Sequence, residues 1–167
     1  MTTEPAEASP ASPKAAALLM YLTYAAGAAG VFIGFMTVAQ TPPSLRWAAV
    51  LAVGVGGGLS FLRHSVFHRS DAVRMGWDSG QRNNFQIEVG LANLAWALLA
   101  FGAVIFDWGI AVEAASFLVF GLYLVAVSVM LVGSRGQGPS RPWAATIGMI
   151  LFGLMLCIVG VMGLQAA

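Results

Sequence analysis

Two histidines and an aspartate stand in the stretch "RHSVFHRSDAVRMGWD", which begins at Arg63 in a chain with few charged residues. His64 and His68 are four residues apart and Asp71 follows three later, so on one continuous helix they share a face, together with Ser60. Such a pair of imidazoles could bind a metal or haem iron, with the carboxylate as a third ligand or as the partner of a ligand. Imidazoles also exchange protons near neutral pH. His64, His68 and Asp71 are therefore metal candidates on spacing alone. Because no further His or Cys completes a site, no cofactor is predicted.

The same stretch also fits an anchor at the membrane surface. Val66, Val73 and Trp77 would lie on the lipid headgroups while the arginines reach phosphates, as in an amphipathic interfacial segment. In this interpretation the histidines are interfacial residues, and Arg69 and Arg74 are there for topology alone.

A second polar set opens the next apolar run, "NNFQIEVGLANLAWALLAF". Asn83 is a helix N-cap with Gln86 three residues on, a variant of the capping box. Gln86 and Asn93 then share one helix face, which suits contact with another helix. Glu88 lies elsewhere on the helix, about one turn into the run. A carboxylate at this depth faces the bundle interior with a partner and is a functional hypothesis by default. The partners expected on the same side are Arg63, His64 and Arg82.

The composition of the chain predicts that these residues lie on or between transmembrane helices. Of the 167 residues, 59% are hydrophobic and only 9% are charged, against roughly 25% charged in soluble domains, so the chain is predicted to be an integral membrane protein. We expect an all-α bundle of five transmembrane helices in one domain, after a disordered tail at 1–14 rich in Pro, Ala and Ser. The expected spans are 15–39, 46–63, 85–106, 110–132 and 143–164, with an amphipathic cytosolic segment at 64–84.

Orientation follows from the basic residues. Seven of the eight lie in the tail, the second loop and the fourth loop, and only Arg46 lies on the other side. The positive-inside rule then predicts a cytosolic N-terminus and an outside C-terminus, in an inner or plasma membrane. Asp107 and Glu113 flank the outer hairpin and are expected to be solvated. A net charge of +1 predicts no nucleic-acid partner.

The stretch from Phe61 to Phe106, with "FLRHSVF", "MGW" and "NNFQIEVGLANLAWALLAF", resembles an uncharacterised bacterial family of small multi-spanning membrane proteins, a domain of unknown function. The core of the resemblance is Phe-Gln-x-Glu-Val-Gly-x-Ala-Asn-Leu, and the "QRNN" before Phe85 departs from the family's shorter turn. The resemblance implies no activity. It implies only the motif positions, which are His64, Trp77, Gln86, Glu88, Gly90 and Asn93.

Three functions remain open on the sequence. The first is a non-enzymatic accessory or structural membrane component, with the bilayer and a second copy or a membrane complex as partners. Its polar helix clamp would draw on His64, Trp77, Gln86, Glu88 and Asn93. The second is a small proton-coupled transporter that uses Glu88, Asn93 and His64. The third is a metal- or haem-binding redox component that uses His64 and His68. The chain holds no nucleophile–base pattern that predicts an enzyme.

Overall fold

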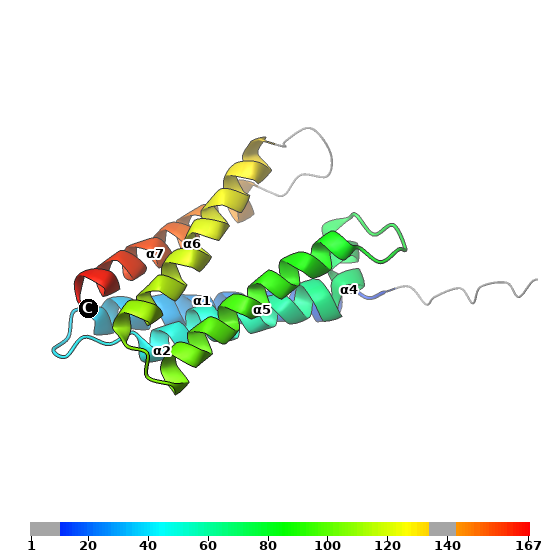
Figure 1. The fold of residues 1–167 in the computed structure, drawn as a ribbon. Helices are drawn as coiled ribbons and strands as arrows, with labels where there is room; N and C mark the ends of the chain where they lie inside the picture. Colours follow the sequence, from blue (N-terminus) through cyan, green and yellow to red (C-terminus); the bar gives the residue numbers. More distant parts are fainter. Residues whose placement is uncertain (1–10, 134–142) are drawn as a thin grey trace, which may run out of the picture.

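The computed structural model describes residues 11–133 and 143–167, and these form six helices and no strand. Five helices are long and apolar enough to cross a membrane, which confirms the predicted all-α fold with five spans (Figure 1). Four of the five are single α-helices: α1 (Lys14–Val38), α5 (Asn84–Ile105), α6 (Ile110–Gly133) and α7 (Trp143–Gln165). Most of the predicted tail and most of the fourth loop, with Arg135 and Arg141, lie outside the described residues.

The other span is built from four consecutive segments: α2 (Arg46–Ala49), η1 (Val50–Val55), α3 (Gly56–Phe61) and η2 (Leu62–Val66). The two η segments are π-helical, with hydrogen bonds that skip one residue more than in an α-helix. One of them joins the amide of Phe67 to the carbonyl of Leu62 at 2.8 Å. The span therefore runs three residues beyond the predicted end at residue 63 and carries Arg63 and His64 in its last turn.

A short sixth helix, α4 (His68–Met75), follows a bend at Phe67. It lies in the predicted amphipathic segment and ends at Gly76, whose φ of 76° is the left-handed conformation that glycine adopts at helix C-termini. Its face toward the bundle buries Ser70, Asp71 and Ala72. The helix is therefore packed against the end of the bundle, and it is not a free segment on the headgroups.

Glycines let α1 and α5 approach the second span closely. A methyl group on Gly30 would lie 2.4 Å from the backbone nitrogen of Ala52, and one on Gly90 would lie 2.0 Å from Ser65 Oγ. Between helices in lipid, where no hydrophobic effect operates, such close backbone contact supplies the association energy. The contact of Gly30 packs α1 against η1, and the contact of Gly90 places η2 next to the first turns of α5.

The last two helices form a hairpin that packs on itself along its length. It diverges from α1 and α5 toward Gly133 and Trp143 (Figure 1). It joins the rest near the other end, where Phe117, Leu156 and Val159 enter the core with Leu45 and Val53. Glu113 also lies there, and it is only 3% exposed. The expectation that Glu113 is solvated is therefore wrong, because the first turn of α6 packs into this core, whereas Asp107 is exposed and pairs with Arg46.

Candidate functional site

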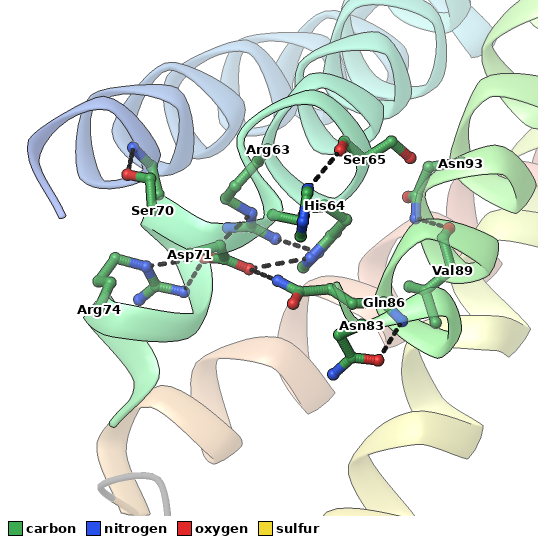
Figure 2. A network of polar contacts seen from close by, with 12 residues as sticks. Arg63, His64, Ser65, Ser70, Asp71, Arg74, Asn83, Gln86, Val89 and Asn93 are labelled. Carbon is green, nitrogen blue, oxygen red and sulfur yellow. Dashed lines mark hydrogen bonds and ion pairs between the residues drawn. The ribbon is translucent and has the colours of Figure 1, made fainter. Parts of the chain in front are cut away.

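A single buried carboxylate organises the polar groups at the α4 end of the bundle. Asp71 is fully buried, and its Oδ1 accepts hydrogen bonds from Arg74 Nε at 3.0 Å and Arg74 Nη2 at 2.8 Å. Its Oδ2 accepts from Gln86 Nε2 at 3.0 Å and lies 3.0 Å from His64 Nδ1. Arg63 Nε lies 3.9 Å from Oδ1 (Figure 2). We call these five residues, Asp71, Arg63, His64, Arg74 and Gln86, the Asp71 clamp.

The clamp joins three elements that are separate in the chain. Arg63 and His64 come from η2, Asp71 and Arg74 from α4, and Gln86 from the first turn of α5. Both carboxylate oxygens are engaged by protein groups, so the buried charge is compensated where it lies. The arrangement holds the end of the second span, the short helix and the start of α5 in one geometry.

The electrostatics favour an ionised aspartate. Burial alone raises the pKa of Asp71, but the hydrogen bond from His64, the charges of Arg63 and His64, and the hydrogen bond from Arg74 outweigh it. The pKa of the carboxyl therefore lies well below its usual range. A carboxylate held in this state is a counter-ion and an acceptor, and it is not available as a proton donor.

The two ring nitrogens of His64 face groups of opposite kind. Arg63 Nη2 lies 2.7 Å from His64 Nε2, and a guanidinium can only donate, so Nε2 is the acceptor. The ionised Asp71 can only accept, so Nδ1 carries the proton that it receives. The tautomer with its proton on Nδ1 therefore satisfies both neighbours.

Gln86 reaches Asp71 because Asn83 starts α5 one turn earlier. The Asn83 Oδ1 accepts the Gln86 amide at 3.1 Å, which confirms the predicted N-cap. The Gln86 side chain does not turn back to complete a capping box, since its Nε2 is bonded to Asp71. Its Oε1 is buried without a hydrogen-bond partner in the described chain, and turning the amide over would set that oxygen against Asp71 Oδ2. The carboxylate thus dictates the orientation of the amide.

Two serines extend the contacts of the clamp. Ser70 Oγ accepts the amide of Ala16 at 3.1 Å and donates to the carbonyl of Ser12, so a residue of α4 caps the first turn of α1. The residue before α1, Pro13, makes no side-chain cap of its own. Ser65 Oγ donates to the carbonyl of Ile87 at 3.0 Å and ties η2 to α5.

The structure brings together only some of the residues singled out from sequence. His64 and Gln86 meet at Asp71. Asn93 is buried on the same face of α5, but its amide bonds to the carbonyl of Val89 in its own helix at 2.7 Å. Trp77 is 48% exposed at the end of α4.

Glu88 does not join the clamp. It is exposed and forms no hydrogen bond or ion pair within the described part of the chain. Two residues along a helix is a rotation of about 200°, so Glu88 points away from the face that carries Gln86. The expected contact of Glu88 with Arg63 or His64 is therefore wrong, and Asp71 takes both of those partners instead.

The metal candidates do not converge either. The bend at Phe67 breaks the expected stripe, and His68 Nδ1 faces the carbonyl of Ser65 at 3.0 Å. Both ring nitrogens of His64 are engaged within the clamp. Residues 11–133 and 143–167 contain no group of three His, Cys, Asp or Glu side chains placed to hold a metal ion.

Sequence reasoning named Asp71 as a metal candidate but missed its role as a buried counter-ion and the part that Arg74 plays. Arg74 was explained by topology alone, yet it makes two hydrogen bonds to Asp71. The available signal was the Asp71–Arg74 spacing of three residues, which pairs side chains on one helix face.

The sequence model of a family of unknown function, DUF6790, matches residues 15–162. No curated protein and no solved structure matches the chain.

Proposed function

The chain belongs to DUF6790, a family of unknown function, and we propose from the geometry of its site that it is a non-enzymatic structural or accessory component of a membrane. The Asp71 clamp is its organising feature on the cytosolic side of an inner or plasma membrane. The bilayer is one partner, and a second copy or a membrane complex is the other.

The observation that carries this proposal is the complete engagement of the Asp71 carboxylate by groups from three elements. A catalytic or transporting carboxylate needs a free position for a substrate or a proton. Asp71 is fully buried and held ionised by cations, which supports a role in holding helices together.

The transporter alternative draws less support from the geometry. Its three residues are dispersed: Glu88 is on the exposed face of α5, Asn93 bonds within its own helix, and His64 is engaged by Arg63 and Asp71. The cytosolic placement of the clamp rests on the excess of basic residues in the tail and in the second and fourth loops.

The test is Asp71→Asn, with Glu88→Gln as the matched control. Asp71→Asn keeps the shape but removes the charge that compensates two arginines, and breaking a buried pair costs about 3 kcal/mol or more. We expect less protein in the membrane fraction and a lower midpoint of thermal unfolding in detergent. Glu88→Gln should stay within about 0.5 kcal/mol of the parent, as for other exposed substitutions. A stable Asp71→Asn protein at parental abundance would refute the clamp.

A further inference from the structure

Glu88 is a carboxylate on the outward side of a span. It lies in the second turn of α5, and its side of that helix continues through the exposed residues Leu91, Ala95 and Leu98. We call these four residues the Glu88 face. A carboxylate within a transmembrane helix normally faces the bundle interior and pairs with a partner there. The outward position of Glu88 instead suits a cation that a neighbouring molecule brings.

The first helix carries a similar face of opposite charge. Lys14 is the first residue of α1 and is exposed, and exposed residues follow on its side of the helix at intervals of four, three and four: Leu18, Tyr21 and Ala25. We call these four residues the Lys14 face. Each face therefore has one charged residue at the start of its helix and apolar or aromatic residues beyond it.

The two charges lie at nearly the same height in the bundle. The amide of Ala16 bonds to Ser70 of α4, and the side chain of Gln86 bonds to Asp71, the next residue of α4. Lys14 is two residues before Ala16 and Glu88 is two residues after Gln86, so each is displaced by about 3 Å along its helix. Their heights thus differ by about one helical turn, which a flexible lysine side chain can span.

Within one chain the two faces point apart. Ala52 of the second span meets Gly30 of α1, and Gly54, two residues on, meets the ring of Phe101 in α5. Two residues are about half a turn of helix, so α1 and α5 lie on opposite sides of the second span. Both helices start at the α4 end, so α1 of one copy and α5 of another run parallel when the copies share an orientation.

We infer that copies of this chain associate head to tail in the membrane: the Glu88 face of one copy packs on the Lys14 face of the next, and the two charges form an ion pair. The inference rests on the structural function proposed above and names a second copy as the partner. Such a heterologous contact leaves one face unused at each end, so it closes a ring or continues as a row.

Charge favours this contact over symmetric pairing. Two copies related by a two-fold axis through α5 would set Glu88 against Glu88, and an axis through α1 would set Lys14 against Lys14. Like charges at an interface weaken it strongly, whereas opposite charges fix its register. The pairing of α1 with α5 is the arrangement in which each charge meets its opposite.

Aligning the two charges also brings large side chains opposite small ones. Tyr21 and Ala95 each lie seven residues, about two turns, beyond the charged residue of their own face. About one turn further, the sizes are reversed, with Ala25 on α1 and Leu98 on α5. Small residues at such positions let helices approach closely in lipid.

The first experiment is disulfide crosslinking in membranes that hold two differently tagged chains. Both carry Cys157→Ala, which removes the single cysteine of the parent; one carries Leu18→Cys and the other Leu91→Cys. We expect a crosslinked dimer of the two different chains after treatment with a membrane-permeant oxidant, and none from either chain alone. Leu122→Cys, at an exposed position on α6, replaces Leu91→Cys as the control and should give none.

Each other result of this experiment contradicts the inference. A dimer from the Leu91→Cys chain alone would show pairing of α5 with α5. A dimer from the Leu18→Cys chain alone would show pairing of α1 with α1. No dimer in any mixture, or equal amounts with the Leu122→Cys control, would show that lipid alone covers the two faces.

The second experiment exchanges the charges. Association is measured by energy transfer between C-terminally labelled copies in phosphatidylcholine vesicles, which carry no net charge. Glu88→Lys sets two cations against each other and should weaken association at least tenfold. Adding Lys14→Glu to the same chain restores opposite charges and should recover most of the loss. A double variant as weak as Glu88→Lys would overturn the ion pair.

The outcome is separable from the clamp proposal. In dilute detergent the copies separate, so Glu88 variants keep the parent's stability there and serve as controls for Asp71→Asn. If Asp71→Asn is destabilised but the Leu18→Cys and Leu91→Cys chains do not crosslink, the head-to-tail contact fails and the clamp stands. If they crosslink but Asp71→Asn behaves as the parent, the clamp fails and the contact stands.

Discussion

Gln86 Nε2 donates to Asp71 Oδ2 at 3.0 Å across 15 residues of chain, so the first turn of α5 is bonded to the short helix that precedes it. Gln86→Met keeps the length of the side chain and removes this donor. Because hydrogen bonds to charged groups contribute about 1.5–3 kcal/mol, we expect the free energy of unfolding to fall by that amount. Thermal or denaturant unfolding in detergent measures it. Glu88→Met, about half a turn away on the exposed face, is the control, and equal losses in both variants would argue against a specific bond.

Gly90 and Ser65 offer a test of the close approach between α5 and η2. In Gly90→Ala the new methyl group would lie 2.0 Å from Ser65 Oγ, and overpacking of this kind costs typically 1–3 kcal/mol. Ser65→Ala removes that oxygen, so the double variant should recover part of the loss, and a double-mutant cycle measures the coupling. Gly58→Ala is the control, since its methyl group would meet nothing within 4 Å. Strictly additive effects would show that the two residues do not touch.

Ser70 lies in α4, but we expect it to stabilise the first turn of α1. Ser70→Ala removes the acceptor for the Ala16 amide, and loss of an N-cap costs about 0.5–2 kcal/mol. Hydrogen exchange should therefore quicken in the first turn of α1, in addition to any change in α4. Ser79→Ala, at an exposed position in the loop after α4, is the matched control. Protection of Ala16 that survives Ser70→Ala would disprove the cap.

Acid should weaken the clamp through Asp71. Its pKa is lower in the folded protein than in the unfolded chain, so its contribution to stability is complete above the ordinary aspartate range, near pH 4. The contribution is lost as the pH falls from there through the lower folded-state value. Unfolding midpoints between about pH 6 and pH 2 should drop more for the parent than for Asp71→Asn, which has no charge to lose. Parallel curves would contradict this prediction.

The ends of the first span and the start of α5 were predictable because clear signals mark them. Pro42 and Pro43 close the first run, and Asn83 caps the start of α5 as expected. The second span was harder to bound. Its last turn carries the polar residues Arg63 and His64, so the apolar pattern stops before the helix does. The helix continues there because the Asp71 clamp compensates those two side chains.

The candidate site was predictable in part. His64 and Gln86 stood out as polar groups in apolar surroundings, and both belong to the clamp. Asp71 was also singled out, but as a metal ligand on a straight helical stripe and not as the common partner of His64 and Gln86. The π-turn in η2 and the bend at Phe67 redirect that stripe, and no local pattern announces them. Glu88 drew attention as a carboxylate within a span, yet its angle on α5 excludes it from the bundle face.

The cap that Ser70 provides to α1 has a consequence for biosynthesis. Ala16 and Ser70 are 54 residues apart, so the ribosome releases the first span well before the residue that completes its first turn. During membrane insertion the Ala16 amide therefore lacks this acceptor until the second span and α4 have followed. The bond between Ala16 and Ser70 can form only after the first two spans have both been synthesised.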